Sequence, residues 1–257
     1  MLLHHATWKE VETRLAVDQG IILPIGSTEQ HGPNGLVGTD AICAEVIARG
    51  VGEAVDALVA PTISVGMAVH HMDFAGSMTL RPSTLIALVG DMVLSLARHG
   101  FRRFFFVNGH GGNIATMQAA FYEIYAAAEG IGLASDGRAG SNRPPATPRC
   151  VLHNWYDARG VRAISAELYA GREGSHATPS EVAVTQWAYP ETIKTVPLDP
   201  PVAPSGRFFG AEDFRRRFPD GRIGSDPSLA TPEAGKRLYD ASVADLAQTY
   251  REFLAAE

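Results

Sequence analysis

Three candidate metal ligands, Glu29, His31 and Asp40, lie within twelve residues of one another. They follow an apolar run over residues 21–25 that breaks at Gly26, a pattern typical of the C-terminal end of a buried strand. In open α/β sheets, ligands bind at that end. Carboxylates and an imidazole are ligands that divalent metals prefer, and residues two apart in an extended loop face the same side. We therefore expect half of a metal site here, with an ordinary polar surface loop as the alternative.

A second cluster is the stretch NGHGGN over residues 108–113, which places His110 among three glycines. Glycines at the end of a strand let the backbone approach a ligand closely. The alternative is a phosphate-cradling turn in which the histidine is incidental. No P-loop lysine follows the glycines, so a nucleotide-binding interpretation is weak.

The third cluster combines His176 with Glu181, five residues later, where a polar loop meets a helix. Glu181 is a candidate ligand, but it would also suit a helix start, where the helix dipole favours a carboxylate. His70 and His71, with Asp73 nearby, form a fourth cluster. We interpret these two imidazoles as buried groups or pocket walls rather than as ligands. The histidines without a loop context, which we interpret as structural, are His4, His5, His99 and His153.

Strands and helices alternate along the chain, and the polar clusters follow the strands. Apolar runs predict strands over residues 20–25, 57–63 and 101–107, and helical spacing predicts helices over 39–54, 82–99 and 114–129. This alternation indicates a parallel sheet with helices on both faces. The other expectations are a helix capped by Thr7, a fourth strand over 131–134, loops over 137–149 and 171–180, an edge strand over 151–156, a helix or apolar run over 181–188 and a last helix opened by Thr231.

Composition and charge narrow the class of protein. The chain has 257 residues, 46% of them hydrophobic and 19% charged, which suits a globular protein with a large core. Its net charge of -6 argues against nucleic-acid or anionic-membrane partners. Two cysteines are too few for a disulfide framework, and Cys43 is expected to be a buried thiol. Neither a signal peptide nor a membrane span is apparent, so we expect a cytoplasmic protein.

The segment over residues 194–227 differs from the rest of the chain, which we expect to form a single domain over residues 1–257. It is rich in proline, glycine and arginine, so we expect a long irregular excursion. In a compact domain, a segment of this length is usually functional or covers a neighbouring subunit. A solvated basic loop is the alternative, because three arginines stand together at residues 215–217.

Together these motifs resemble the creatininase (creatinine amidohydrolase-like) family of metal hydrolases. The resemblance extends over about residues 20–188 and rests on PIGSTEQHG at 24–32, Thr39–Asp40, FAGS at 74–77, NGHGGN at 108–113, and His176 with Glu181. It implies a three-layer α/β fold with a mostly parallel central sheet flanked by helices. It also implies a homo-oligomer, often a hexamer.

The resemblance further implies a site for two divalent ions, with Zn, Mn and Fe as candidates. Glu29, His31, Asp40 and His110 match the family's ligand positions, with Asp40 as the bridging carboxylate. Creatininase itself has Tyr and Glu after this histidine, where the present chain has Gly111 and Gly112. We therefore expect Glu181 to be the fifth ligand and His176 to be the general acid and base. The predicted substrate-binding residues are His71, Ser77 and Gly111.

The expected activity is hydrolysis of a small, cyclic amide or a formamide by a metal-bridging hydroxide. Creatinine itself is not expected, because the two glycines remove one ligand and one aromatic pocket residue of creatininase. One alternative is hydrolytic C–C cleavage of a cyclic keto-sugar or polyol at the same binuclear site. The other is a non-catalytic metal-binding subunit, which a general acid–base candidate beside the ligands makes less attractive.

Overall fold

The computed structural model describes residues 1–130 and 147–256, and its centre is a parallel sheet. The strand order is β2–β1–β3–β4, and every neighbouring pair is parallel. Parallel strands covered on both faces are expected to be apolar throughout, and all six residues of β1 are buried. The strands are β1 (Gly20–Ile25), β2 (Leu58–Val59), β3 (Arg103–Asn108) and β4 (Arg149–Asn154).

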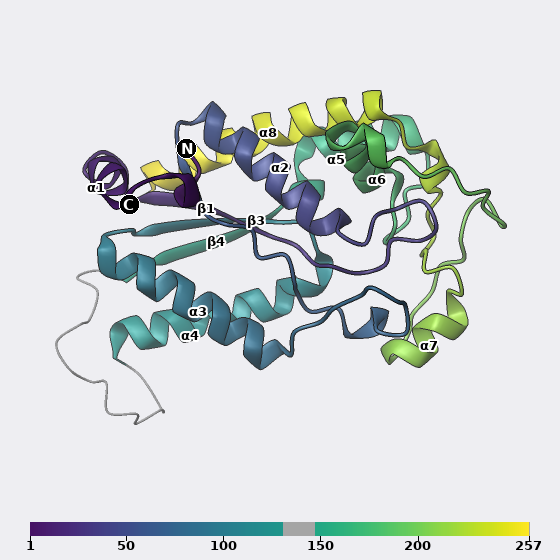
Figure 1. The fold of residues 1–257 in the computed structure, drawn as a ribbon, viewed down its shortest axis with the longest axis horizontal. Coiled ribbons are helices and arrows are strands. Elements are labelled where there is room, and N and C mark those ends of the chain that lie inside the picture. Colours follow the sequence, from purple (N-terminus) through teal and green to yellow (C-terminus); the bar gives the residue numbers. More distant parts are fainter. Residues whose placement is uncertain (131–146, 257) are drawn as a thin grey trace.

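Helices cover both faces of the sheet and give the three layers that the sequence predicts (Figure 1). One face carries α2 (Thr39–Ala54), α5 (Arg159–Tyr169), α6 (Pro179–Ala188) and α8 (Pro232–Ala255), and the other carries α3 (Pro82–His99) and α4 (Ile114–Glu129). The shorter helices are α1 (Trp8–Leu15), α7 (Gly210–Arg217) and the 3₁₀ turns η1 (Leu3–His5), η2 (Val69–His71), η3 (Gly111–Asn113), η4 (Trp155–Asp157), η5 (Pro190–Thr192) and η6 (Pro227–Leu229).

Successive side chains of the strands feed two separate hydrophobic cores, because neighbours in a strand point to opposite faces of the sheet. Ile22 and Phe105 pack with α2, α5, α6 and α8 in one core. Ile21, Phe104 and Phe106 pack with α3 and α4 in the other core. The buried strands therefore form a rigid platform, and the loops that carry the polar clusters leave it at its carboxyl edge.

The first turn of α2 lies directly against the ends of β1 and β3, and this contact positions Asp40. A Cβ at Gly26 would overlap the backbone of Ala41, and a Cβ at Gly109 would overlap the carbonyl oxygen of Asp40. Both glycines are therefore required by close backbone approach. The same approach brings Asp40 beside the loops that follow the two central strands.

Replacing Gly109 with alanine should lower the free energy of unfolding by about 1–3 kcal/mol, because the added methyl group forces the backbone of α2 away from β3. Gly90 of α3 provides the matched control, since a Cβ there would meet nothing within 4 Å. Gly90→Ala should instead raise stability by about 0.5–1 kcal/mol through helix propensity. Urea denaturation measures both variants, and equal effects at the two positions would contradict the close approach described here.

Several predicted elements differ from those observed. The strand expected over 57–63 keeps only Leu58–Val59 in the ladder, because the pairing slips by one residue: Ala60 N–H donates to the Ile22 carbonyl, but the next donor to β1 is Ile63, three residues later, which forms an isolated bridge with Ile25. The edge strand begins two residues earlier than predicted, at Arg149. The strand expected over 131–134 lies outside the described residues. The capping box of Thr7 with Glu10, the closing helix after Thr231 and the buried thiol of Cys43 are all confirmed.

The segment over 194–227 is not irregular throughout, because it contains α7, whose Phe214 is fully buried. Figure 1 shows α7 beyond the carboxyl ends of the strands, at the opposite end of the molecule from α1. Phe214 packs edge-on against His71, with ring centroids 4.7 Å apart. The segment therefore packs against the predicted site of its own chain. Among the described residues, no helix is both long and apolar enough to cross a bilayer.

Candidate metal centre

The loops after β1 and β3, the first turn of α2 and the start of α6 bring the predicted ligands together. Nε2 of His31 lies 3.0 Å from Asp40 Oδ1 and 3.8 Å from Glu181 Oε1. Nδ1 of His110 lies 3.1 Å from Asp40 Oδ2, and its Nε2 lies 3.2 Å from Glu29 Oε2. Glu29, His31 and Asp40 also form a group whose ligand atoms all lie within 4.8 Å of one another. The five predicted ligands thus form one continuous cluster.

Backbone carbonyls assign a proton to one nitrogen of each imidazole. Nδ1–H of His31 donates to the carbonyl of Glu29 at 3.0 Å, and Nε2–H of His110 donates to the carbonyl of Met67 at 2.9 Å. The other ring nitrogens, Nε2 of His31 and Nδ1 of His110, face carboxylate oxygens of Asp40. Each of these contacts needs a positive charge, which either a proton on the ring nitrogen or a metal ion can supply. This is the arrangement of metal-binding histidines, whose second nitrogen is held by a hydrogen bond.

The close partners of Glu29 are imidazoles, with His71 Nε2 at 3.1 Å from Oε1 and His110 Nε2 at 3.2 Å from Oε2. The Glu29 side chain is fully buried, and neither carboxylate oxygen receives a hydrogen bond. A buried ionised carboxylate without hydrogen bonds is strongly unfavourable unless it is paired with a charge or coordinates a metal. Asp40 Oδ2 is also buried without a hydrogen-bond partner. The donor set therefore fits hard and borderline divalent ions that accept oxygen and imidazole ligands.

The electrostatics of the cluster favour positive charge at its centre. Burial disfavours a charged imidazole, but the carboxylates around His31, Asp40 above all, outweigh it and raise its pKa to about 10. Burial acts against His110 in the same way, yet the neighbouring carboxylates of Glu29 and Asp40 raise its pKa to about 9. Burial would raise the pKa of Asp40, but the two imidazoles hold it well below its usual range.

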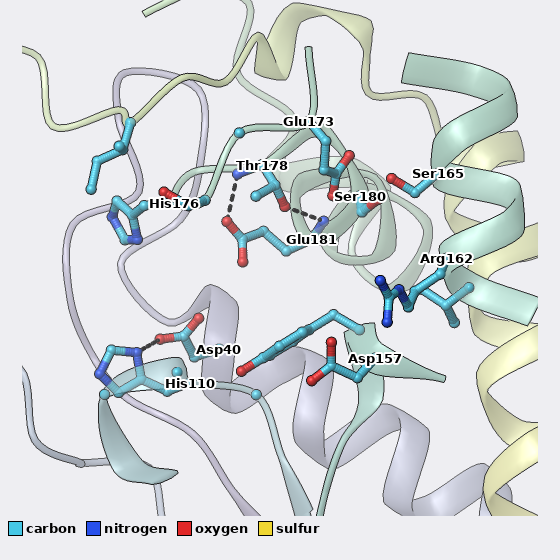
Figure 2. A pocket seen from close by; sticks show the side chains of 18 of the residues that line it. Asp40, His110, Asp157, Arg162, Ser165, Glu173, His176, Thr178, Ser180 and Glu181 are labelled. Carbon is cyan, nitrogen blue, oxygen red and sulfur yellow. Dashed lines mark hydrogen bonds and ion pairs between the residues drawn. The ribbon is translucent and has the colours of Figure 1, made fainter. Parts of the chain in front are cut away.

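Glu181 caps the start of α6 and also lies beside the ligand cluster. As the third residue of α6, it forms a capping box in which its Oε1 accepts the N–H of Thr178 at 2.5 Å and its own N–H donates to Thr178 Oγ1 at 3.2 Å. Figure 2 shows the carboxylate directed from this helix start toward Asp40. Burial raises the pKa of Glu181 to about 7, despite the proximity of His31. The cap fixes the side chain, and the oxygen that accepts the Thr178 N–H is also the one that lies 3.8 Å from His31 Nε2.

His176 lies beside the cluster and is buried, and its Nδ1 is 3.8 Å from Glu29 Oε1. Nε2–H donates to the carbonyl of Gln30 at 2.7 Å, which leaves Nδ1 without a proton. Burial, together with the neighbouring imidazoles, holds the pKa of His176 well below its usual value. His176 is also within ligand distance of His31 and Glu181, so its position suits either coordination or proton transfer.

Gln30 is a part of the site that the sequence analysis did not identify. Its Oε1 accepts the N–H of Gly32 at 2.8 Å, so the amide nitrogen faces His71 Nδ1 at 2.9 Å. Nε2 of His71 then carries the proton and lies 3.1 Å from Glu29 Oε1. Gln30 therefore orients an imidazole that supports a candidate ligand. Gln30 lies within the motif PIGSTEQHG, but an amide is not among the ligand types that the motif was expected to supply.

An elongated cavity of about 810 Å³ opens onto the cluster. Of the predicted substrate-binding residues, His71 and Gly111 line it, whereas Ser77 does not and instead accepts the backbone N–H of Gln30 at 3.1 Å. The wall opposite the metal cluster comes from η4, α5 and the loop over 171–175, in which the sequence analysis identified no motif. Its side chains include Tyr156, Asp157, Arg162, Ser165 and Glu173.

The fold and this cluster together define an α/β protein with a buried site for divalent metal ions. The chain belongs to the creatininase family, because the family model described as creatinine amidohydrolase matches residues 4–250. The resemblance stated from the motifs is thus confirmed. The chain is accordingly a hydrolase that acts on C–N bonds, as its named relatives are.

Curated relatives differ in the substrate that their names state. A creatinine amidohydrolase of Pseudomonas putida is 27% identical over 96% of this chain and 94% of its own length. A mycofactocin precursor peptide peptidase of Mycobacterium tuberculosis is 30% identical over 88% of this chain and 82% of its own. A 3-dehydro-scyllo-inosose hydrolase of Thermotoga maritima is 32% identical over 41% of this chain and 34% of its own.

Solved structures that resemble this chain include metal-bound creatininases. One described as creatininase Mn is 25% identical, covers 99% of both chains and has a TM-score of 0.79. A mutant creatininase of Zn-Zn type is 25% identical, has a TM-score of 0.78 and covers 99% of this chain and 98% of its own. The metals named for these structures agree with the donor set found in the buried cluster here.

Proposed function

We propose that this protein is a two-metal amidohydrolase that cleaves a small amide other than creatinine. The observation that carries the proposal is the pair of imidazoles, His31 and His110. Each donates one proton to a backbone carbonyl and turns its other ring nitrogen toward an oxygen of Asp40. Such a set suits Zn, Mn or Fe held by Glu29, His31, Asp40, His110 and Glu181.

Each group of the chain has a defined task in this reaction. Two divalent ions bound here would activate water and polarise the amide carbonyl. Asp40 offers one oxygen to each side of the cluster, which suits a bridging position. Nδ1 of His176 is the ring atom left to take up a proton and return it to the leaving nitrogen, as a general acid–base requires. The Gln30 amide orients His71, and backbone carbonyls orient the rings of His31, His110 and His176.

The glycine pair supports a substrate other than creatinine. A Cβ at Gly112 would overlap Nε2 of His110, so no side chain fits there while His110 faces Asp40. A Cβ at Gly111 would stand 3.6 Å from the hydroxyl of Tyr156, so the space that this glycine leaves belongs to the cavity. The cavity is therefore open where creatininase carries larger groups.

A product screen with zinc- or manganese-loaded protein tests the proposal. The panel contains creatinine, five- and six-membered cyclic amides, N-formyl amines, short peptides and a cyclic diketone, with a chelator-treated sample as control. We expect metal-dependent release of an amine or ammonia from an amide other than creatinine. Acid release from the diketone alone would favour C–C hydrolysis. Full metal loading without turnover of any compound would favour a non-catalytic subunit.

We further propose that residues 1–257 form a single domain and that the protein assembles as a homo-oligomer. The support is the family resemblance together with the position of α7 at the site. Phe209, which immediately precedes α7, is 80% exposed, whereas Phe214 within α7 is buried.

A further inference from the structure

The cavity is larger than the chemistry at the metal cluster requires. Its volume of about 810 Å³ lies in the upper part of the range of roughly 300–1,000 Å³ that is typical of sites for drug-sized ligands. Figure 2 shows Asp40, His110 and Glu181 on one side and Arg162, Ser165 and Glu173 away from them, toward α5. A single-ring amide at the metals would leave the α5 side of the cavity empty.

Arg162 distinguishes this second part of the cavity. It is the only lysine or arginine that lines the cavity in the described part of the chain. No carboxylate of the described residues lies within 4.0 Å of its guanidinium, although Asp157 and Glu173 line the same wall. Arg162 thus presents a permanently charged, planar set of donors to the cavity. Such a fork binds carboxylates with two parallel hydrogen bonds.

The surrounding charges make this arginine decisive for an anionic group. Asp157 and, when ionised, Glu173 would repel a carboxylate that entered the α5 side. Among the described residues of this wall, Arg162 is the one positive charge that can attract an anion. Replacing that arginine with a neutral residue would leave only acidic charges on this wall, which disfavours an anion.

We propose that Arg162 binds a carboxylate of the substrate, which is therefore an amide whose far end is anionic, as in an acylated amino acid. This inference rests on the proposed function, because the amide must lie at the metal cluster while the carboxylate reaches α5. It assigns substrate selectivity to a residue on the cavity wall rather than to the metal ligands.

Metal-chelating probes test this inference without knowledge of the natural substrate. The probes are hydroxamic acids with a terminal carboxylate at the end of two to six methylene groups, each paired with its methyl ester. Isothermal titration of the zinc-loaded protein measures both members of each pair. At one chain length, we expect the carboxylate to bind about ten- to a hundredfold more tightly than its ester, as a charge-assisted pair provides.

Two variants identify the arginine responsible. Arg162→Gln should reduce the ratio to about one, and Arg162→Lys should give an intermediate ratio because it retains the charge without the planar fork. Arg159→Gln removes the same charge from the same helix at a position outside the cavity lining and should leave the ratio unchanged.

The outcomes separate this inference from the proposed function. If both members of every pair bind equally, or if Arg162→Gln keeps the preference, the carboxylate site is wrong and the metal site stands. If the zinc-loaded protein binds no hydroxamate at all, the accessible metal site is wrong and the inference fails with it.

Discussion

Replacing Asp40 with alanine should remove both metal ions and lower the hydrolytic rate by more than about 10³-fold. The reason is that its two oxygens face different imidazoles, Oδ1 toward His31 and Oδ2 toward His110, so one carboxylate serves both halves of the site. Metal content after gel filtration in metal-free buffer measures the first effect. Amine release from the best amide of the screen measures the second.

Asp157 provides the control for this variant, because it lines the cavity but lies apart from the ligand cluster in Figure 2. Asp157→Ala removes the same kind of charge from the same cavity and should keep the full metal content. Retention of two ions by Asp40→Ala would show that Asp40 does not bridge the site, even if the rate fell.

The second large effect is expected at Glu181, which should serve one half of the site only. Glu181→Gln keeps an acceptor for the Thr178 N–H but loses the negative charge beside His31. We expect one ion per chain to be lost and the other to be retained, with the affinity of the weakened position reduced by about a hundredfold or more. Titration with zinc against a competing chelator resolves the two binding steps.

Glu173→Gln is the matched control, because Glu173 is a carboxylate near the same helix start that does not belong to the ligand cluster. Its two zinc affinities should equal those of the wild type. Two unchanged affinities in Glu181→Gln would assign this residue to the helix cap alone, and the fifth ligand would then lie elsewhere, with His176 as the nearest candidate.

The half of the site after β1 and β3 could be predicted because its residues are close in sequence and follow strands whose pattern is unambiguous. A parallel sheet brings the carboxyl ends of its central strands together. The alternation of strands and helices was therefore enough to predict that Glu29 and His110 lie close together. Glu181 could be predicted only as a candidate, because the same sequence spacing encodes a capping box.

The opposite wall of the cavity could not be predicted, and the physical reason is the absence of local constraint. Arg162 is one polar residue on the exposed side of α5, and nothing near it in sequence indicates that this side faces the metal cluster. The contact of Phe214 with His71 is equally invisible, because it joins residues 143 positions apart through a segment without periodicity. The early end of β2 is also invisible, because the slip in pairing between Ala60 and Ile63 leaves no signal in a run of apolar residues.

The metal content of the wild-type protein tests the central claim most directly. The protein is stripped with a chelator, reloaded with excess zinc or manganese, passed through metal-free buffer and analysed by mass spectrometry of the elements, with amino-acid analysis for the chain concentration. We expect two ions per chain, since both carboxylate oxygens of Glu29 and Oδ2 of Asp40 are buried without a hydrogen bond that would otherwise satisfy them. A value of one ion or none per chain, in protein that is folded by circular dichroism, would contradict a two-metal site.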